Sequence, residues 1–197
     1  MDLRAELILM LSLIAFGAGF IKGEDRKPVT VEIKTPIGSI EVVLNPERAP
    51  VTTENFLKYV RGGFYDGGRF HRTVTPQNQP GQAVKIEVIQ ASIAPSREKE
   101  EFPPIPLERT CKTGIKHLDG AISMARAEPD TATSDFFICI GDQPQLDEGG
   151  KRNPDGQGFA AFGRVVKGMD VVRRIQRSPA QGQTLSPPVP ILSIRMK

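Results

Sequence analysis

Arg72 is the residue of this chain whose chemical type and expected neighbours are suited to catalysis. It lies in the segment Phe70-His71-Arg72-Thr73-Val74, which we interpret as a strand. Because side chains alternate along a strand, we expect Phe70, Arg72 and Val74 to share one face. An arginine is always protonated and presents several fixed N–H donors. Beside apolar neighbours, such a donor could stabilise an atom that gains a lone pair during a reaction, and no nucleophile would be needed.

A second strand could supply the apolar neighbours. Residues 136–140 are all apolar, and alternation places Phe137 and Cys139 on one face, with Phe136 and the remaining two residues on the other. A single arginine is usually a solvated surface charge, and an aromatic residue in an apolar strand usually packs in a core. The surrounding sequence pattern must therefore decide whether Arg72 and Phe137 belong to one site.

Short strands and two helices are the elements that would position these residues. Alternating apolar residues in 29–35 and 40–44, separated by a Pro-Ile-Gly-Ser turn, predict a hairpin. Pro50 precedes a segment with helical spacing that Gly62-Gly63 closes, which predicts a helix of about three turns. Further strands are predicted at 70–74, 84–91, 120–125, 136–140, 159–165 and 189–196, and a second short helix at 169–176.

The region 92–117 interrupts this pattern of strands. It contains Pro95, Pro103, Pro104 and Pro106, and this many prolines exclude a long helix. We therefore predict a long surface loop, and loops of this length are usually functional or mobile.

Composition limits the classes of function. The chain has 197 residues, 39% of them hydrophobic, which is enough for one compact domain. The net charge of +3 comes from 26 basic and 23 acidic residues without a long basic run, so we expect no nucleic-acid partner. The two histidines have no cysteine or carboxylate cluster at ligand spacing, and we expect neither a metal nor a cofactor. Cys139 is predicted to be a small buried hydrophobic residue rather than half of a disulfide with Cys111.

The N-terminal segment differs from the rest of the chain. Residues 7–21 are almost entirely apolar, and the charged run 22–27 follows abruptly. Fifteen residues are too few for a comfortable membrane span of about 18 to 20 residues but fit the core of a signal peptide. We expect an exported protein, periplasmic or extracellular, with an uncleaved membrane anchor as the alternative. Residues 1–27 would then form the signal or anchor and linker, and 28–197 the domain.

Three ordered segments carry a resemblance to a known family. These are the runs 64–72 (FYDGGRFHR), 123–138 (SMARAEPDTATSDFFI) and 159–172 (FAAFGRVVKGMDVV). Together they resemble the cyclophilins, a family of peptidyl-prolyl cis-trans isomerases. The resemblance implies a mainly β fold, a closed eight-stranded antiparallel barrel capped by two helices. It also implies isomerisation of X-Pro bonds in polypeptide substrates, with Arg72 as the catalytic residue and Phe137 as the floor of a proline pocket.

The resemblance implies further site residues. Val88 and Leu146 match apolar walls of the pocket, and Gln90 matches a glutamine that hydrogen-bonds the substrate backbone. Ala125 and Ala127 match the strand edge along which the peptide lies. We expect a monomer without stable membrane insertion of the domain.

Several positions depart from the family pattern. Glu87 stands where the family has a phenylalanine, Phe159 where it has a pocket histidine, and Asp135 where it has a glutamine. Gln145 stands where a tryptophan lines the pocket and donates its indole N–H to cyclosporin-type peptides. These differences predict an altered pocket and weak binding of such peptides, with Gln145 and Phe159 still among the residues that contact the substrate.

Two other functions compete with isomerisation. The first is a non-catalytic peptide-binding or chaperone module that retains the barrel, although such a module would have no evident use for Arg72. The second is suggested by Ser96-x-x-Lys99 and Lys112-Thr113-Gly114, which match signatures of penicillin-recognising acyl-transfer enzymes. Those two motifs lie too close together in this chain, and the Ser-Asp-Asn element that should separate them is absent.

Overall fold

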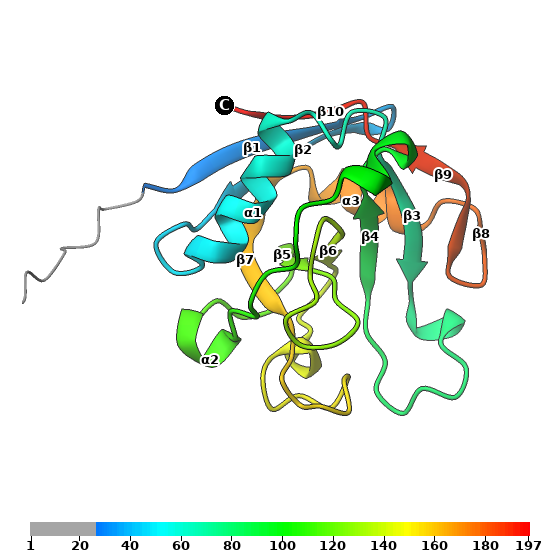
Figure 1. The fold of residues 1–197 in the computed structure, drawn as a ribbon. Coiled ribbons are helices and arrows are strands. Elements are labelled where there is room, and N and C mark those ends of the chain that lie inside the picture. Colours follow the sequence, from blue (N-terminus) through cyan, green and yellow to red (C-terminus); the bar gives the residue numbers. More distant parts are fainter. Residues whose placement is uncertain (1–26) are drawn as a thin grey trace, which may run out of the picture.

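A computed structural model describes residues 27–197 of the chain (Figure 1). Within this range there are three α-helices, α1 (Pro50–Arg61), α2 (Thr110–Thr113) and α3 (Met169–Gln176). The same range contains ten strands, β1 (Val29–Thr35), β2 (Gly38–Leu44), β3 (Arg69–Val74), β4 (Val88–Ser92), β5 (Ala121–Met124), β6 (Phe136–Cys139), β7 (Ala160–Lys167), β8 (Ala180–Gln181), β9 (Thr184–Pro190) and β10 (Ser193–Met196). The predicted signal or anchor at 7–21 lies outside the described residues.

All ten strands belong to one antiparallel sheet with the order β10-β1-β2-β7-β5-β6-β4-β3-β9-β8. β9 and β10 lie toward opposite ends of this order, yet only Ile191 and Leu192 separate them along the chain. The sheet must therefore bend until its two ends come close. Across residues 27–197, however, no ladder pairs β8 with β10, so the sheet is not closed.

The predicted closed barrel of eight strands is thus corrected in two respects. The expected last strand at 189–196 is split, because the chain leaves its pairing with β3 after Pro190 and pairs with β1 from Ser193 onward. The short hairpin partner β8 adds the other strand. Neither change was visible in the local alternation of apolar residues, since pairing partners depend on the curvature of the whole sheet.

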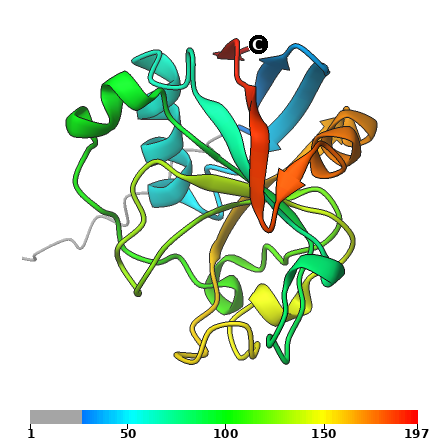
Figure 2. The same cartoon turned by 90° about the vertical axis from the view of Figure 1, so that its right-hand side faces the viewer.

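The two predicted helices are confirmed as α1 and α3, which lie on opposite sides of the molecule in Figure 2. α1 begins at a proline and has Ala49 at its N-cap, which offers no side-chain acceptor. Glu108, from the long loop, takes over this role, because its carboxylate accepts hydrogen bonds from the backbone N–H of Val51 and Thr52 at 3.1 and 2.8 Å. Gly62 follows the last residue of α1, as predicted.

The long loop at 92–117 is more ordered than its proline content suggested. It contains a 3₁₀ turn at Pro95–Glu100 and the short helix α2, which the sequence analysis did not predict. Phe102 packs against Tyr59, with ring centroids 4.8 Å apart, and its backbone N–H donates to the Tyr59 hydroxyl at 2.9 Å. Burial raises the pKa of Tyr59 to about 12. The loop is thus anchored on α1 by an aromatic contact.

Buried apolar side chains form two clusters on opposite faces of the sheet. The larger one is the main core, centred on aromatic residues such as Phe56, Phe136 and Phe162. The smaller one lies on the other face of β4 and β6 and includes Phe137 and Cys139. The predicted alternation in 136–140 is confirmed by this division. Cys139 is buried and Cys111 exposed, and both are free thiols. None of the helices formed by residues 27–197 is long and apolar enough to cross a membrane.

Candidate active site

A β-bulge in β3 turns Arg72 toward the smaller cluster. Phe70 pairs with Ala91, but Arg72 pairs with Gln90, so His71 is an extra residue on this strand. Phe70 consequently faces the main core, whereas Arg72 faces the opposite side. The prediction that Phe70 and Arg72 share a face is wrong, because strict alternation holds only where the register is unbroken.

Two glutamine side chains hold the Arg72 guanidinium. Its Nε and Nη2 atoms donate to Gln183 Oε1 at 2.9 and 2.6 Å, and Nη1 donates to Gln90 Oε1 at 2.9 Å. The amide of Gln90 in turn donates to Asp135 Oδ2 at 3.0 Å. Burial lowers the pKa of Arg72, and the nearby Arg152 lowers it further. An arginine nevertheless stays protonated near neutral pH, so the group remains a fixed cationic donor.

A hollow of about 240 Å³ with both apolar and polar lining residues adjoins Arg72. Its floor is the ring of Phe137, which is 5% exposed and meets the ring of Phe159 edge-on at 5.3 Å. Seven of the nine site residues predicted from the sequence line this hollow, namely Arg72, Val88, Gln90, Ala125, Phe137, Leu146 and Phe159. They come from β3, β4 and β6 and from three segments outside the strands, so the fold brings together residues that lie far apart in the sequence.

The other two predicted site residues do not line the hollow. Gln145 is exposed, and its side-chain oxygen accepts a hydrogen bond from the backbone N–H of Lys151 at 3.0 Å. Ala127 is also exposed, and its N–H donates to the Thr131 hydroxyl at 3.2 Å. Gln145 therefore braces its own loop, and the N–H of Ala127 is already occupied within the chain.

Glu87, which the resemblance matches to a phenylalanine of the family, does not line the hollow either. Its carboxylate accepts a hydrogen bond from Gln176 of α3 at 2.9 Å. Ile86 lines the hollow instead, on the same side as Val88, as the period of two requires. The wall is thus apolar where the sequence suggested a charge.

Several residues of the site were missed. Ile86, Arg126, Arg152 and Asn153 complete the lining of the hollow, and Gln183 holds Arg72. Arg152 and Gln183 lie 80 and 111 residues beyond Arg72 in the sequence, and no local pattern marks either of them. Only the pairing of β9 with β3 brings Gln183 to this place.

Ser123, His117 and Asp147 form a hydrogen-bonded chain behind the hollow. His117 Nδ1 lies 2.8 Å from Asp147 Oδ1, and its Nε2 lies 3.0 Å from Ser123 Oγ. Nucleophilic hydrolases use the same three residue types. Here Ser123 is 0% exposed and His117 is 1% exposed, so no substrate reaches the hydroxyl. The imidazole stacks on Phe137 with ring centroids 6.0 Å apart. The three hydrogen-bonded residues therefore support the floor of the hollow.

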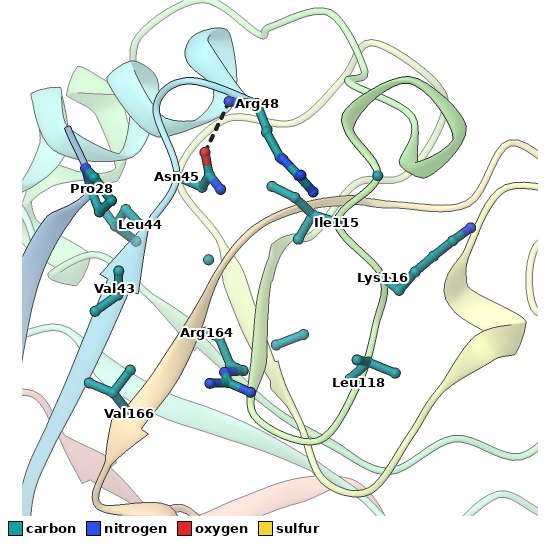
Figure 3. A pocket seen from close by; sticks show the side chains of 13 residues that line it. Pro28, Val43, Leu44, Asn45, Arg48, Ile115, Lys116, Leu118, Arg164 and Val166 are labelled. Atoms are coloured by element: carbon teal, nitrogen blue, oxygen red, sulfur yellow. Dashed lines mark hydrogen bonds between the residues drawn. The ribbon is translucent and has the colours of Figure 1, made fainter. Parts of the chain in front are cut away.

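A larger hollow of about 370 Å³ lies elsewhere, between the end of β2, the segment 114–118 and β7 (Figure 3). It shares no lining residue with the hollow beside Arg72. Its walls include the exposed side chains of Leu118 and Val166, and Arg48 extends beside Ile115, while Lys116 points away from the hollow. Asn45 Oδ1 accepts a hydrogen bond from the backbone N–H of Arg48 at 3.0 Å, but among the described residues neither the Arg48 nor the Arg164 guanidinium is held by hydrogen bonds as that of Arg72 is, so this hollow is not the better candidate for chemistry.

Comparisons with known proteins identify the family to which the chain is similar. The family model described as "Cyclophilin type peptidyl-prolyl cis-trans isomerase/CLD" matches residues 29–196. Peptidyl-prolyl cis-trans isomerase A of Dickeya dadantii is 37% identical over 184 residues, which cover 93% of this chain and 87% of that protein. A peptidyl-prolyl cis-trans isomerase of Acinetobacter baylyi is 32% identical over 190 residues, covering 93% of this chain and 94% of the relative.

Solved structures show the same fold. A cyclophilin-type isomerase from Cryptosporidium parvum superimposes with a TM-score of 0.69 at 20% identity, covering 87% of this chain and 98% of that one. A second structure of that protein, in the presence of the dipeptide Ala-Pro, superimposes with a TM-score of 0.68 at 21% identity, covering 85% and 98%. The bent antiparallel sheet, the family match over nearly the whole described range and the level of identity lead to one conclusion: this chain belongs to the cyclophilin-type peptidyl-prolyl cis-trans isomerases.

Proposed function

We propose that the hollow beside Arg72 is where this isomerase rotates the X-Pro bond. The observation that carries this assignment is a guanidinium fixed by two neutral acceptors beside the apolar side chains of Val88, Phe137 and Leu146. A proline ring would lie on Phe137, and the preceding residue would follow the wall at Ala125. Isomerisation of a short X-Pro peptide by the Arg72→Ala variant tests the assignment.

The chemistry follows from the barrier to rotation. Turning an X-Pro amide costs about 18 to 20 kcal/mol, because rotation breaks the resonance of the C–N bond. In the twisted state the prolyl nitrogen regains a lone pair and can accept a hydrogen bond. Arg72 has five N–H groups, of which three donate to Gln183 and Gln90, so two remain for this nitrogen and for the substrate carbonyl. The glutamines fix the donor before the substrate arrives, which avoids reorganisation during the reaction.

Gln183 should matter for catalysis although it need not touch the substrate. We expect Gln183→Ala to lower kcat/KM by about tenfold, because a misdirected donor loses roughly one good hydrogen bond in the transition state. Gln183→Glu is the informative partner variant, since its carboxylate still accepts from Arg72 and should keep the guanidinium in place. Measurement of kcat and KM for both variants checks this, and equal activity of Gln183→Ala and wild type would contradict the positioning role.

The pH profile should be nearly flat between about pH 6 and 8.5, because Arg72 does not titrate there. Burial raises the pKa of the Asp135 carboxyl, and the hydrogen bond from Gln90 and the charge of His71 lower it in part. Burial also lowers the pKa of His71, although the charge of Asp135 raises it in part. As the pH falls, Asp135 gains its proton earlier than an ordinary aspartate does, so any loss of activity should lie on the acid side.

Activity measured from pH 5 to 9 checks this profile. Asp135→Asn should keep the plateau and remove the acid limb, because its side-chain oxygen still accepts from Gln90. A basic limb near neutral pH would show that a titrating group other than Arg72 takes part.

The substrates we propose are proline-containing polypeptides, bound by one monomer without a cofactor, a metal or nucleic acid. The structure of the Cryptosporidium parvum relative in the presence of Ala-Pro supports this substrate class. We also propose that the protein is exported, with residues 1–27 as the signal or anchor and 28–197 as the catalytic domain, because 7–21 are apolar. Fractionation of expressing cells, with N-terminal sequencing of the mature chain, separates a cleaved signal from a retained anchor.

A further inference from the structure

The hollow beside Arg72 carries an excess of positive charge. Arg72, Arg126 and Arg152 line it, and none of its lining residues is acidic. Arg126 is compensated, because its Nη1 lies 2.8 Å from a carboxylate oxygen of Asp155. Across residues 27–197, neither Arg72 nor Arg152 has a carboxylate within 4.0 Å. Two cations of the site are thus without an anionic partner.

Arg152 is also held in place by hydrogen bonds. Its Nη1 donates to Gln79 Oε1 at 3.0 Å and to the backbone oxygen of Val84 at 2.7 Å. Gln79 is 1% exposed and donates to the Ile86 oxygen at 2.8 Å, so the acceptor is itself fixed. These bonds join the loop that carries Arg152 to the loop between β3 and β4, and the two loops lie side by side in Figure 1.

The remaining donors of Arg152 are free to meet a ligand. Within the described part of the chain, its Nε and Nη2 atoms have no hydrogen-bond partner. Burial lowers the pKa of Arg152, and the charge of Arg152 contributes to the lowered pKa of Arg72, so the two cations lie close enough to repel each other. A carboxylate placed near both would relieve this repulsion and could accept two parallel N–H bonds from Arg152. A basic side chain would be repelled.

We propose that Arg152 is a specificity-determining residue that makes this isomerase prefer polypeptide segments with an acidic residue immediately before or after the proline. The inference rests on the proposed location of the isomerase site, since Arg152 can select substrates only if the peptide binds in the hollow that it lines. The carboxylate of Asp135 lies outside the lining, and its ion-pair neighbour is His71, at 4.0 Å, rather than Arg152.

The expected size of the preference for acidic peptides follows from the partial exposure of Arg152 to solvent. Charge pairs at exposed or half-exposed sites change affinities by up to about fivefold at low ionic strength. Salt screens such pairs, because the Debye length falls from about 10 Å at 0.1 M to about 3 Å at 1 M. We therefore expect acidic peptides to be turned over about fivefold better than neutral ones at 0.05 M salt, and less than about twofold better at 1 M.

The test uses two matched series of short peptides, Ala-Ala-Xaa-Pro-Ala-Ala and Ala-Ala-Pro-Xaa-Ala, with Xaa as Glu, Gln or Lys. NMR exchange spectroscopy measures catalysed isomerisation without a coupled protease, and the readout is the ratio of kcat/KM for Glu over Gln. In the full-length protein at low salt this ratio should be about five in at least one series, and the Lys peptide should be the poorest. Arg152→Gln should bring the ratio to about one, whereas Arg152→Lys should retain most of it.

Arg164→Gln is the matched control, because it removes the same charge from the larger hollow and should leave the ratio unchanged. Asn153→Asp offers an independent variant if Arg152→Gln does not fold, since a carboxylate next to Arg152 should also lower the ratio. A Glu-to-Gln ratio near one in the wild type, or a ratio lost equally in Arg152→Gln and Arg152→Lys, would overturn the proposal. A separate measurement tests the location of the site itself. If Arg72→Ala keeps full activity on the Gln peptide, isomerisation does not take place in this hollow.

Discussion

Arg72→Ala is expected to reduce kcat/KM for X-Pro isomerisation by about a hundredfold to a thousandfold. Removal of one preorganised donor from a transition state typically costs about 2.7 to 4 kcal/mol. Here the donor is half-buried and is fixed by Gln183 and Gln90 beside the ring of Phe137. The loss should appear mainly in kcat, because the proline still has Phe137 to rest on. Exchange spectroscopy on a short peptide measures both constants.

Two further measurements show whether a loss of rate in Arg72→Ala comes from the missing donor or from a disturbed fold. Arg72→Lys keeps the charge but not the planar fork, so it should recover only a small part of the rate. Thermal unfolding of both variants shows whether the fold is intact, which we expect because Arg72 lies outside the main core. If Arg72→Ala folds normally and keeps more than half of the wild-type rate, the hollow beside Arg72 is not the site of catalysis.

Phe137→Ala should have the second largest effect, on stability and activity together. The side chain is 5% exposed and contacts the rings of Phe159 and His117, so its loss leaves a cavity. Truncation of a buried phenylalanine costs about 3 to 5 kcal/mol of the unfolding free energy. If about 60 Å² of contact with the proline ring is also lost, about 25 cal/mol per Å² lowers kcat/KM by about tenfold.

The neighbouring residue provides the matched control. Phe136 lies in the main core on the opposite face of β6 and is 0% exposed. Phe136→Leu and Phe137→Leu remove similar volumes from adjacent positions, and both should lower the midpoint of denaturant unfolding. Only Phe137→Leu should lower kcat/KM of the folded enzyme, measured well below that midpoint. Equal activities of the two Leu variants would show that Phe137 does not touch the substrate.

The sequence alone was sufficient for features that depend on neighbouring residues. The hairpin of β1 and β2, the helix that begins at Pro50, and the two faces of 136–140 all follow from local spacing and from residues that begin or end an element. The cyclophilin-like segments also identified Arg72, Phe137 and Phe159 as residues of the hollow, and β6, which carries Phe137, pairs with both of its neighbours without a register shift. In such segments the side-chain direction is determined by counting residues.

Side-chain directions that depend on strand register, and contacts between residues far apart in the sequence, were decided only by the tertiary structure. A single extra residue, His71, reverses the faces of β3 and sends Arg72 away from Phe70, because the side-chain period is two and a bulge shifts it by one. Gln183 and Arg152 come from far along the chain, and their places are set by the pairing of β9 with β3 and by the buried amide of Gln79. The conformations of loops likewise placed Gln145 and Ala127 outside the hollow. The type of chemistry could thus be predicted from residue patterns, whereas the groups that hold the Arg72 guanidinium and the arginines that line the hollow are brought together only by the folded sheet.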